Sequence, residues 1–418
     1  MELKPHGLNI DLKVELLGKK KPINKQRSSF EAIVEVDNGQ NKGKLTFPMR
    51  SFNKYLLEWL WQMFSGDITT NPYLGTATKA AGIDTKLKSV NCLATAGTLA
   101  GLVIGTTDSN YLDANTIALQ GVLEHSDDAT AGTVNYGITS WDTAGTGLAN
   151  GEYGFCIKRK ISNQTSSTLF PIVTGIKTRN ANAGASKAYI AFEEINEGNV
   201  VSFAPLSDLN LTFVFYVQPS TYQVTKTGGI TRILYDIIKD LIFRGQSATT
   251  PENYINNSPT SYTYTSSLDA TSSTQNMLKI IPSTPTTAKG ILLFVNENDK
   301  YSREGEFPSN INILPTTVTL GTGTSVVSGL TLGTNVMSKI EVTNSTITSF
   351  TVYRDFANNT NNLIKCTRVG LVSGASDLAT HLLAYNLVFS EDSNSQNASI
   401  VVPAGDTLRV SYTFSTEM

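Results

Sequence analysis

Residues 350–371 read FTVYRDFANNTNNLIKCTRVGL, and the chain contains a second version of this stretch at residues 155–176, FCIKRKISNQTSSTLFPIVTGI. The two align without a gap at an offset of 195 positions (350 minus 155). Each alternates apolar and polar residues up to an Asn-x-Thr triplet and then resumes an apolar run. Alternation with period 2 places one set of side chains on one face of a strand, and Asn and Thr suit a tight bend. We therefore predict two strands around a polar turn in each copy.

Two pairs of polar residues occupy matching positions in the copies: Arg159 with Arg354, and Asn163 with Asn358. The arginines lie in strands that are otherwise half buried, where a guanidinium needs acceptors for its hydrogen bonds. We expect each arginine to bracket a carboxylate or backbone carbonyls within its own half. All four residues are therefore assigned a structural role.

The similarity extends beyond the motif. Each copy is followed by an alternating tail, and the two tails are offset by 199 positions (414 minus 215). Each tail has a proline before its last strand, Pro205 or Pro403. Before the motif, we pair GLVIGT (101–106) with GLTLGT (329–334). A shared order with drifting spacing indicates a duplicated domain with loop insertions. The sequence thus predicts a mainly β protein of two tandem antiparallel β-sandwich domains, jelly-roll-like, over residues 1–219 and 220–418.

Two stretches have helical rather than strand periodicity. Residues 50–64 (RSFNKYLLEWLWQMF) and 230–243 (ITRILYDIIKDLIF) each place apolar residues on one helical face. We predict one helix per domain, packed against the open side of its own sandwich. Trp59 and Trp61 are also candidates for an interface, Trp61 because it lies off the main apolar stripe and aromatic residues often anchor contacts between subunits.

Residues 246–287 are dominated by Ser, Thr, Asn, Pro and Tyr. Such a composition buries little surface and is typical of an extended arm, here expected to contact a neighbouring subunit. Its tyrosines Tyr254, Tyr262 and Tyr264 are further interface candidates.

Composition narrows the possible partners. Charged residues make up 16% of the chain, against about 25% in an average soluble domain, and the formal net charge is −2. The absence of a basic cluster beyond Lys19–Lys21 disfavours nucleic acid as a primary partner.

The first 21 residues lack a signal-peptide core, and no run of about 20 apolar residues occurs, so we expect no membrane partner. Three cysteines without close spacing are interpreted as buried apolar residues.

No catalytic or metal-binding constellation stands out. His6, His125 and His381 are far apart, and the acidic stretch EHSDD around His125 is interpreted as a solvated turn rather than a cation site. Phosphate-binding glycine loops, nucleophile elbows and zincin helices are not found. We expect no enzyme activity and no cofactor.

The order GLVIGT, VNYG, FCIKRKISNQTSSTL, VTGI and a proline-led last strand resembles uncharacterised structural proteins of tailed bacteriophages. The second copy fits better, with FTVYRDFANNT, TRVGL, LLAYNLVF and VPAGDTLRVSYTF, and such proteins also tend to have an upstream Arg-Ser-Phe helix, here at 50–52. The resemblance covers most of both halves except residues 67–100 and 246–287. It implies a virion component that is made and assembled in the cytoplasm of the bacterial host.

The preferred hypothesis is a non-enzymatic structural protein of the capsid, neck or tail that contacts other virion proteins and forms a homo-oligomer in the particle. The alternative is a receptor- or glycan-binding fibre or adhesin module, in which the exposed tyrosines of 246–287 would stack on sugars. A hydrolase of the same kind of particle is a third hypothesis, although no acidic pair is singled out by its context.

Overall fold

A computed structural model describes the chain over the residues that follow. They are 7–17, 24–39, 45–49, 51–52, 54–65, 73, 92, 95–97, 100–106, 123, 134–142, 154–177, 189–195, 201–217, 228–230, 234, 238–239, 248–250, 262–264, 280, 290–294, 313–314, 330–343, 347–366, 368–376, 379–387 and 400–417. Within these residues the protein is mainly β, with antiparallel sheets and a single helical element.

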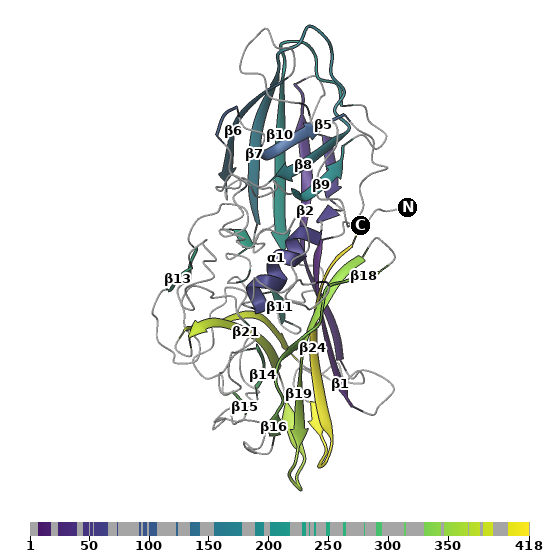
Figure 1. Cartoon of the computed structure of the whole chain (residues 1–418), viewed down its shortest axis with the longest axis vertical. Coiled ribbons are helices and arrows are strands. Elements are labelled where there is room, and N and C mark those ends of the chain that lie inside the picture. Colours follow the sequence, from purple (N-terminus) through teal and green to yellow (C-terminus); the bar gives the residue numbers. More distant parts are fainter. Residues whose placement is uncertain are drawn as a thin grey trace.

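The largest sheet has eleven strands and runs along the length of the molecule (Figure 1). Its main path, in spatial order, is β16 (Leu330–Leu332), β19 (Ile347–Asn358), β24 (Thr407–Glu417), β1 (Leu8–Leu16), β2 (Asn24–Asp37), β10 (Asp208–Val217), β7 (Gly154–Asn163) and β6 (Val134–Asp142). Three short strands lie beside this path: β17 (Val336–Met337) and β18 (Glu341–Thr343) pair with β19, and β3 (Leu45–Met49) pairs with β2.

This path has the same order when read from either end. The motif strands β7 and β19 are each flanked by an edge strand (β6 or β16) and by a tail strand (β10 or β24). The registers agree as well. Phe155 faces Phe215 and Phe350 faces Phe414, with ring centroids 4.8 and 5.1 Å apart. The motif match seen in the sequence therefore extends to strand order and register.

Strand β2 joins the two halves of this sheet. Its first residues, from Asn24 to Phe30, pair with β1, and its last residues, from Phe30 to Asp37, pair with β10. β1 in turn pairs with β24 from Leu8 to Leu16, although β24 lies at the other end of the sequence. The division of the chain into domains 1–219 and 220–418 stays a prediction, and the sheet continues across it.

Smaller sheets complete each half. One consists of β4 (Ser51–Phe52), β9 (Tyr189–Glu194), β8 (Val173–Lys177) and β5 (Gly101–Gly105). The other consists of β11 (Gly228–Ile230), β22 (Ala379–Leu387), β21 (Arg368–Ser376), β14 (Gly290–Phe294) and β15 (Ile313–Leu314). Two strand pairs are separate: β12 (Ala248–Thr250) with β13 (Tyr262–Tyr264), and β20 (Ile364–Cys366) with β23 (Ile400–Val402).

These sheets correct one pairing made from the sequence. GLVIGT contains β5, which pairs with β8 in a small sheet, whereas GLTLGT contains β16, which pairs with β19 in the main sheet. The counterpart of β16 is β6, since Leu330 faces Asn358 as Val134 faces Asn163. The strand that occupies the place of β5 in the second half is β14, which pairs with β21. The two segments have similar sequences because each contains a short apolar strand with a glycine at or directly after its end.

The helix α1 (Lys54–Ser65) lies where the two halves meet (Figure 1). Every side chain from Leu56 to Phe64 is buried. The helix contacts β19 and β24 as well as β9, and the ring of Phe64 lies 5.0 Å from that of Phe414. The contact with β9 agrees with the prediction that the helix packs on its own half, and the contacts with β19 and β24 show that it also packs on strands of the other half.

The second predicted helix, 230–243, is described at few positions. Ile230 ends strand β11, so the helix does not begin there. Leu234 has helical and Ile238 π-helical backbone conformation, and both side chains are buried. The remaining positions lie outside the described residues.

Candidate functional site

The Asn-x-Thr triplet of the first copy forms a hydrogen-bonded turn after β7. The side chain of Asn163 is buried, and its Nδ2 donates to the carbonyls of Ser167 (2.9 Å) and Phe203 (2.8 Å). Its Oδ1 accepts from the backbone N–H (2.9 Å) and the hydroxyl (2.7 Å) of Thr165. One amide thus fixes the turn and ties it to the segment before β10.

The second copy repeats these contacts. Asn358 donates from Nδ2 to the carbonyls of Asn362 and Val402, both at 2.8 Å. Its Oδ1 accepts from the N–H (3.0 Å) and the hydroxyl (2.7 Å) of Thr360. The two turns lie at opposite ends of the long axis of the molecule (Figure 1). We call residues 163–170 with 201–207 the first tip, and residues 358–365 with 400–406 the second tip.

Replacing Asn358 by alanine is expected to lower the free energy of unfolding by about 2–4 kcal/mol, because a buried amide that makes four hydrogen bonds is lost and the Val402 carbonyl loses a donor. Urea denaturation followed by far-ultraviolet circular dichroism measures the loss. The neighbouring Asn359 is the matched control: within the described residues its exposed amide donates to the Thr331 hydroxyl alone, so Asn359→Ala should change stability by less than about 0.5 kcal/mol. Equal effects of the two substitutions would contradict the assignment.

Each tip contains a second turn, just before its tail strand. In the second tip the N–H of Asp406 donates to the carbonyl of Pro403, and Gly405 has φ +80°. In the first tip the N–H of Ser207 donates to the carbonyl of Ala204, and the residue at the place of Gly405 is Leu206, with φ +55°. Leu206 is the one non-glycine residue with positive φ in the described part of the chain.

The two matched arginines connect the main sheet to the small sheets. Arg354 is 2% exposed and donates from Nε to the carbonyl of Gly333 (2.8 Å) and from Nη1 to that of Ile291 (3.0 Å). Gly333 follows β16 and Ile291 belongs to β14, so the guanidinium joins the edge of the main sheet to the facing sheet. Burial lowers the pKa of Arg354 to about 10, which leaves it charged at neutral pH.

Arg159 makes the corresponding bonds in the first half. Its Nε donates to the carbonyl of Gly137 (2.9 Å), and its Nη1 donates to those of Leu102 (2.9 Å) and Ala100. The guanidinium lies 4.7 Å from the ring centre of Tyr136. Burial lowers the pKa of Arg159 to about 10, an effect that Tyr136 partly opposes. The sequence predicted that each arginine would bind either a carboxylate or backbone carbonyls. These bonds all go to backbone carbonyls.

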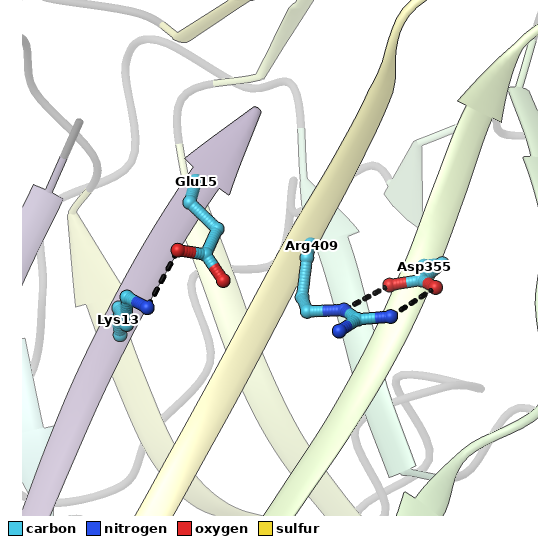
Figure 2. Close-up of polar contacts among 4 residues, drawn as sticks. All are labelled: Lys13, Glu15, Asp355 and Arg409. Carbon is cyan, nitrogen blue, oxygen red and sulfur yellow. Dashed lines mark hydrogen bonds and ion pairs between the residues drawn. The ribbon is translucent and has the colours of Figure 1, made fainter. Parts of the chain in front are cut away.

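Charged side chains of the main sheet also pair in the second half (Figure 2). Arg409 of β24 forms two bonds with Asp355 of β19, at 2.7 and 2.8 Å, and Lys13 of β1 lies 2.6 Å from Glu15 of the same strand. Arg409 also stacks over the ring of Tyr353 at 4.4 Å. Since Arg409 and Asp355 are each about one third exposed, this pair contributes about 1 kcal/mol or less. We interpret it as support for the sheet.

The tryptophans named as interface candidates are buried within the chain. Trp59 is 2% and Trp61 6% exposed, and the indole N–H of Trp61 donates to the carbonyl of Ser338 at 2.9 Å. The expectation that Trp61 faces a neighbouring subunit is therefore wrong, because its side chain is buried within this chain and its indole N–H is bonded to Ser338, just before β18.

The tyrosine candidates are only partly placed. Tyr262 and Tyr264 belong to β13, which pairs with β12, and Tyr254 lies outside the described residues. In the same segment, Ile280 is buried and its N–H donates to the carbonyl of Phe64 at the end of α1. Part of the predicted arm therefore packs on this chain rather than on a neighbour.

The tips present a feature that the sequence had not indicated. Large apolar side chains are exposed there: in the first tip Leu206 (85%) and Phe170 (52%), in the second tip Leu363 (65%) and Val401 (37%). In the sequence, the tail offset of 199 positions aligns Leu206 with Gly405. A leucine aligned with a turn glycine is the signal that could have identified Leu206. Among the described residues, the tips rather than α1 therefore offer the more accessible apolar contacts.

Metal-ligating side chains do not cluster in the described part of the chain. The described residues contain no group of three or more His, Cys, Asp or Glu side chains able to hold a metal ion. His6, His125 and the EHSDD stretch lie outside them. Cys92 and Cys156 are both buried, and burial raises the pKa of the Cys92 thiol. No helix in the described ranges is long and apolar enough to cross a bilayer.

Comparison of the chain with models of protein families, with curated proteins and with solved structures found no match.

Proposed function

We propose that the chain is a non-enzymatic structural component of a tailed-phage particle, in the capsid, neck or tail, built from two duplicated jelly-roll-like β-sandwiches. One observation carries the structural part of this proposal. The polar residues that the chain repeats, Arg159 with Arg354 and Asn163 with Asn358, are buried and bonded to backbone carbonyls. The polar residues that the two halves share thus stabilise the fold of the chain.

The phage context comes from the sequence resemblance, and the shape is compatible with it. A long sheet with similar tips at its two ends can contact neighbours at separate places. In an assembly of many copies, contacts that are individually weak give firm retention because the second contact is effectively intramolecular. The partners would be other virion proteins and further copies of the chain, assembled in the host cytoplasm.

The test is the composition of the particle. Quantitative mass spectrometry with isotope-labelled peptides of this chain, on gradient-purified particles, should give a fixed copy number that survives washing in high salt. Absence from the particles would overturn the proposal. Specific binding of the isolated protein to host cells or glycans would instead support the fibre or adhesin alternative, and polysaccharide turnover that one carboxylate substitution abolishes would support a hydrolase.

A further inference from the structure

The bend directly after β2 contains the dipeptide Asn38–Gly39. Asparagine deamidates most readily before glycine, because glycine has no Cβ to obstruct its backbone nitrogen. Gly39 is exposed, with φ +69° and open space where a Cβ would lie. Its N–H donates to Oδ1 of Asp37 at 2.9 Å, a distance at which a carboxylate can take the proton as a general base. The bend therefore places a base beside the nucleophile of a deamidation reaction.

Asn38 also binds the first tip. Its side chain is 4% exposed, and Nδ2 donates to the carbonyl of Ser202 at 2.8 Å. The next two carbonyls, those of Phe203 and Ala204, accept from Nδ2 of Asn163 at 2.8 and 3.1 Å. One short segment of the tip is thus bound by two asparagine amides, one after β2 and one at the end of β7.

The second half of the molecule has a different pair of residues at this place. Glu15 faces Arg409 in the main sheet as Asp37 faces Asn210, so the pair Leu16–Leu17 occupies the position of the Asn-Gly dipeptide. The architecture that the halves share therefore does not require asparagine and glycine at the end of this strand.

We propose that Asn38 is a deamidation site whose reaction rate is set by opening of the first tip. The nitrogen of Gly39 attacks Cγ of Asn38 to form a succinimide, and the N–H proton passes through the Asp37 carboxylate to Nδ2, which leaves as ammonia. Solvent water then opens the ring. Opening at Cγ gives aspartate, and opening at the backbone carbonyl of residue 38 gives isoaspartate. Because Nδ2 is the leaving group, its hydrogen bond to Ser202 has to break for the reaction to proceed. This inference does not rest on the proposed function.

The products weaken the contact that Asn38 makes. A carboxylate oxygen replaces Nδ2 and cannot donate to Ser202, so a negative charge faces that carbonyl at a position where the side chain is 4% exposed. Isoaspartate also inserts a methylene group into the backbone directly after β2. Neither product reverts to asparagine, so a modified chain keeps a loosened first tip.

Peptide mapping by mass spectrometry, on the full chain incubated at a mildly alkaline pH, tests the proposal. Asn163→Ala removes the amide that binds the adjoining carbonyls, so Asn38 should deamidate at least tenfold faster, because a slow reaction of an open form follows the population of that form. Asn358→Ala, the same change at the second tip, is the matched control and should leave the rate at Asn38 unchanged. The second Asn-Gly dipeptide of the chain, Asn150–Gly151, lies outside the described residues and is the internal reference for the chemistry.

Two further variants test the parts of the mechanism separately. Asp37→Asn retains an oxygen that can accept from Gly39 but is a far weaker base, so it should slow deamidation of Asn38 about tenfold or more and leave Asn150 unchanged. Asn38→Asp reproduces one product. It should speed hydrogen exchange of the Leu169 and Phe203 amides, each of which donates to the carbonyl of the other within the first tip.

Equal rates at Asn38 in the Asn163→Ala and Asn358→Ala variants would overturn control by the first tip, as would a rate in the folded wild type equal to that in urea. An Asn38 that stays intact in Asn163→Ala while Asn150 reacts would overturn the assignment of the site. If Asn163→Ala does not fold, Asp37→Asn decides: a rate at Asn38 that this substitution leaves unchanged rejects the proposed reaction.

Discussion

Arg354→Met is expected to lower the free energy of unfolding by about 3–5 kcal/mol. Methionine retains the apolar stem but removes the donors for the carbonyls of Gly333 and Ile291, which lie 2.8 and 3.0 Å from the guanidinium. Leaving a buried acceptor without a donor costs about 1–3 kcal/mol for each group. The link between the edge of the main sheet and β14 is lost as well. Urea denaturation, followed by circular dichroism, measures the effect.

Arg409→Met is the matched control. Arg409 also makes two hydrogen bonds, but to Asp355 at a site where both side chains are about one third exposed. Its loss should cost about 1 kcal/mol or less. Arg354→Lys separates charge from geometry: one ammonium cannot reproduce the fork of a guanidinium, so we expect it to restore only part of the lost stability. If Arg354→Met were no more damaging than Arg409→Met, the assigned role would be wrong.

Separating the chain between residues 219 and 220 is expected to abolish folding of both fragments. The first fragment would contain β1 without β24, and five side chains of β1 that are at most 4% exposed would lose this cover: Leu8, Ile10, Leu12, Val14 and Leu16. Burying such a side chain contributes about 1.5–3 kcal/mol, so the sum is comparable with the whole stability of a typical domain, about 5–15 kcal/mol. The second fragment would lose β1 and also α1, whose Phe64 packs on Phe350 and Phe414.

Co-expression provides the control for this experiment. The two fragments together should form a 1:1 complex that a tag on either fragment recovers, with the circular dichroism spectrum of the intact chain. The intact chain should unfold in a single calorimetric transition because β2 belongs to both halves of the sheet. A monomeric fragment 1–219 that unfolds cooperatively by itself would show that the halves are independent and that the shared sheet is dispensable.

Local elements could be predicted from the sequence because their signals are local. Alternation over the two motif copies anticipated β7 and β19, and helical periodicity anticipated α1 within a few residues. The turn residues Asn163 and Asn358 were found because their spacing to threonine is the same in both copies.

The choice of partners could not be predicted in the same way. A period of 2 shows which face of β1 is buried but not that β24, about 400 positions away, is its neighbour. The burial of Trp61 depends on residues near Ser338, which helical periodicity cannot reveal. Leu206 was missed because leucine is not a turn former, and only its match with Gly405 exposes the unusual backbone.

The bond from each arginine to a glycine carbonyl has a consequence for growth of the sheet. Gly137 lies within the edge strand β6, at a shift of register between Tyr136 and Thr139, and Gly333 directly follows the edge strand β16. At these points the carbonyl is occupied by an arginine of the same chain and the regular ladder is interrupted. A foreign strand that docked along either border would therefore meet a gap in the row of available acceptors. Irregular borders of this kind disfavour edge-to-edge pairing with the strand of another chain.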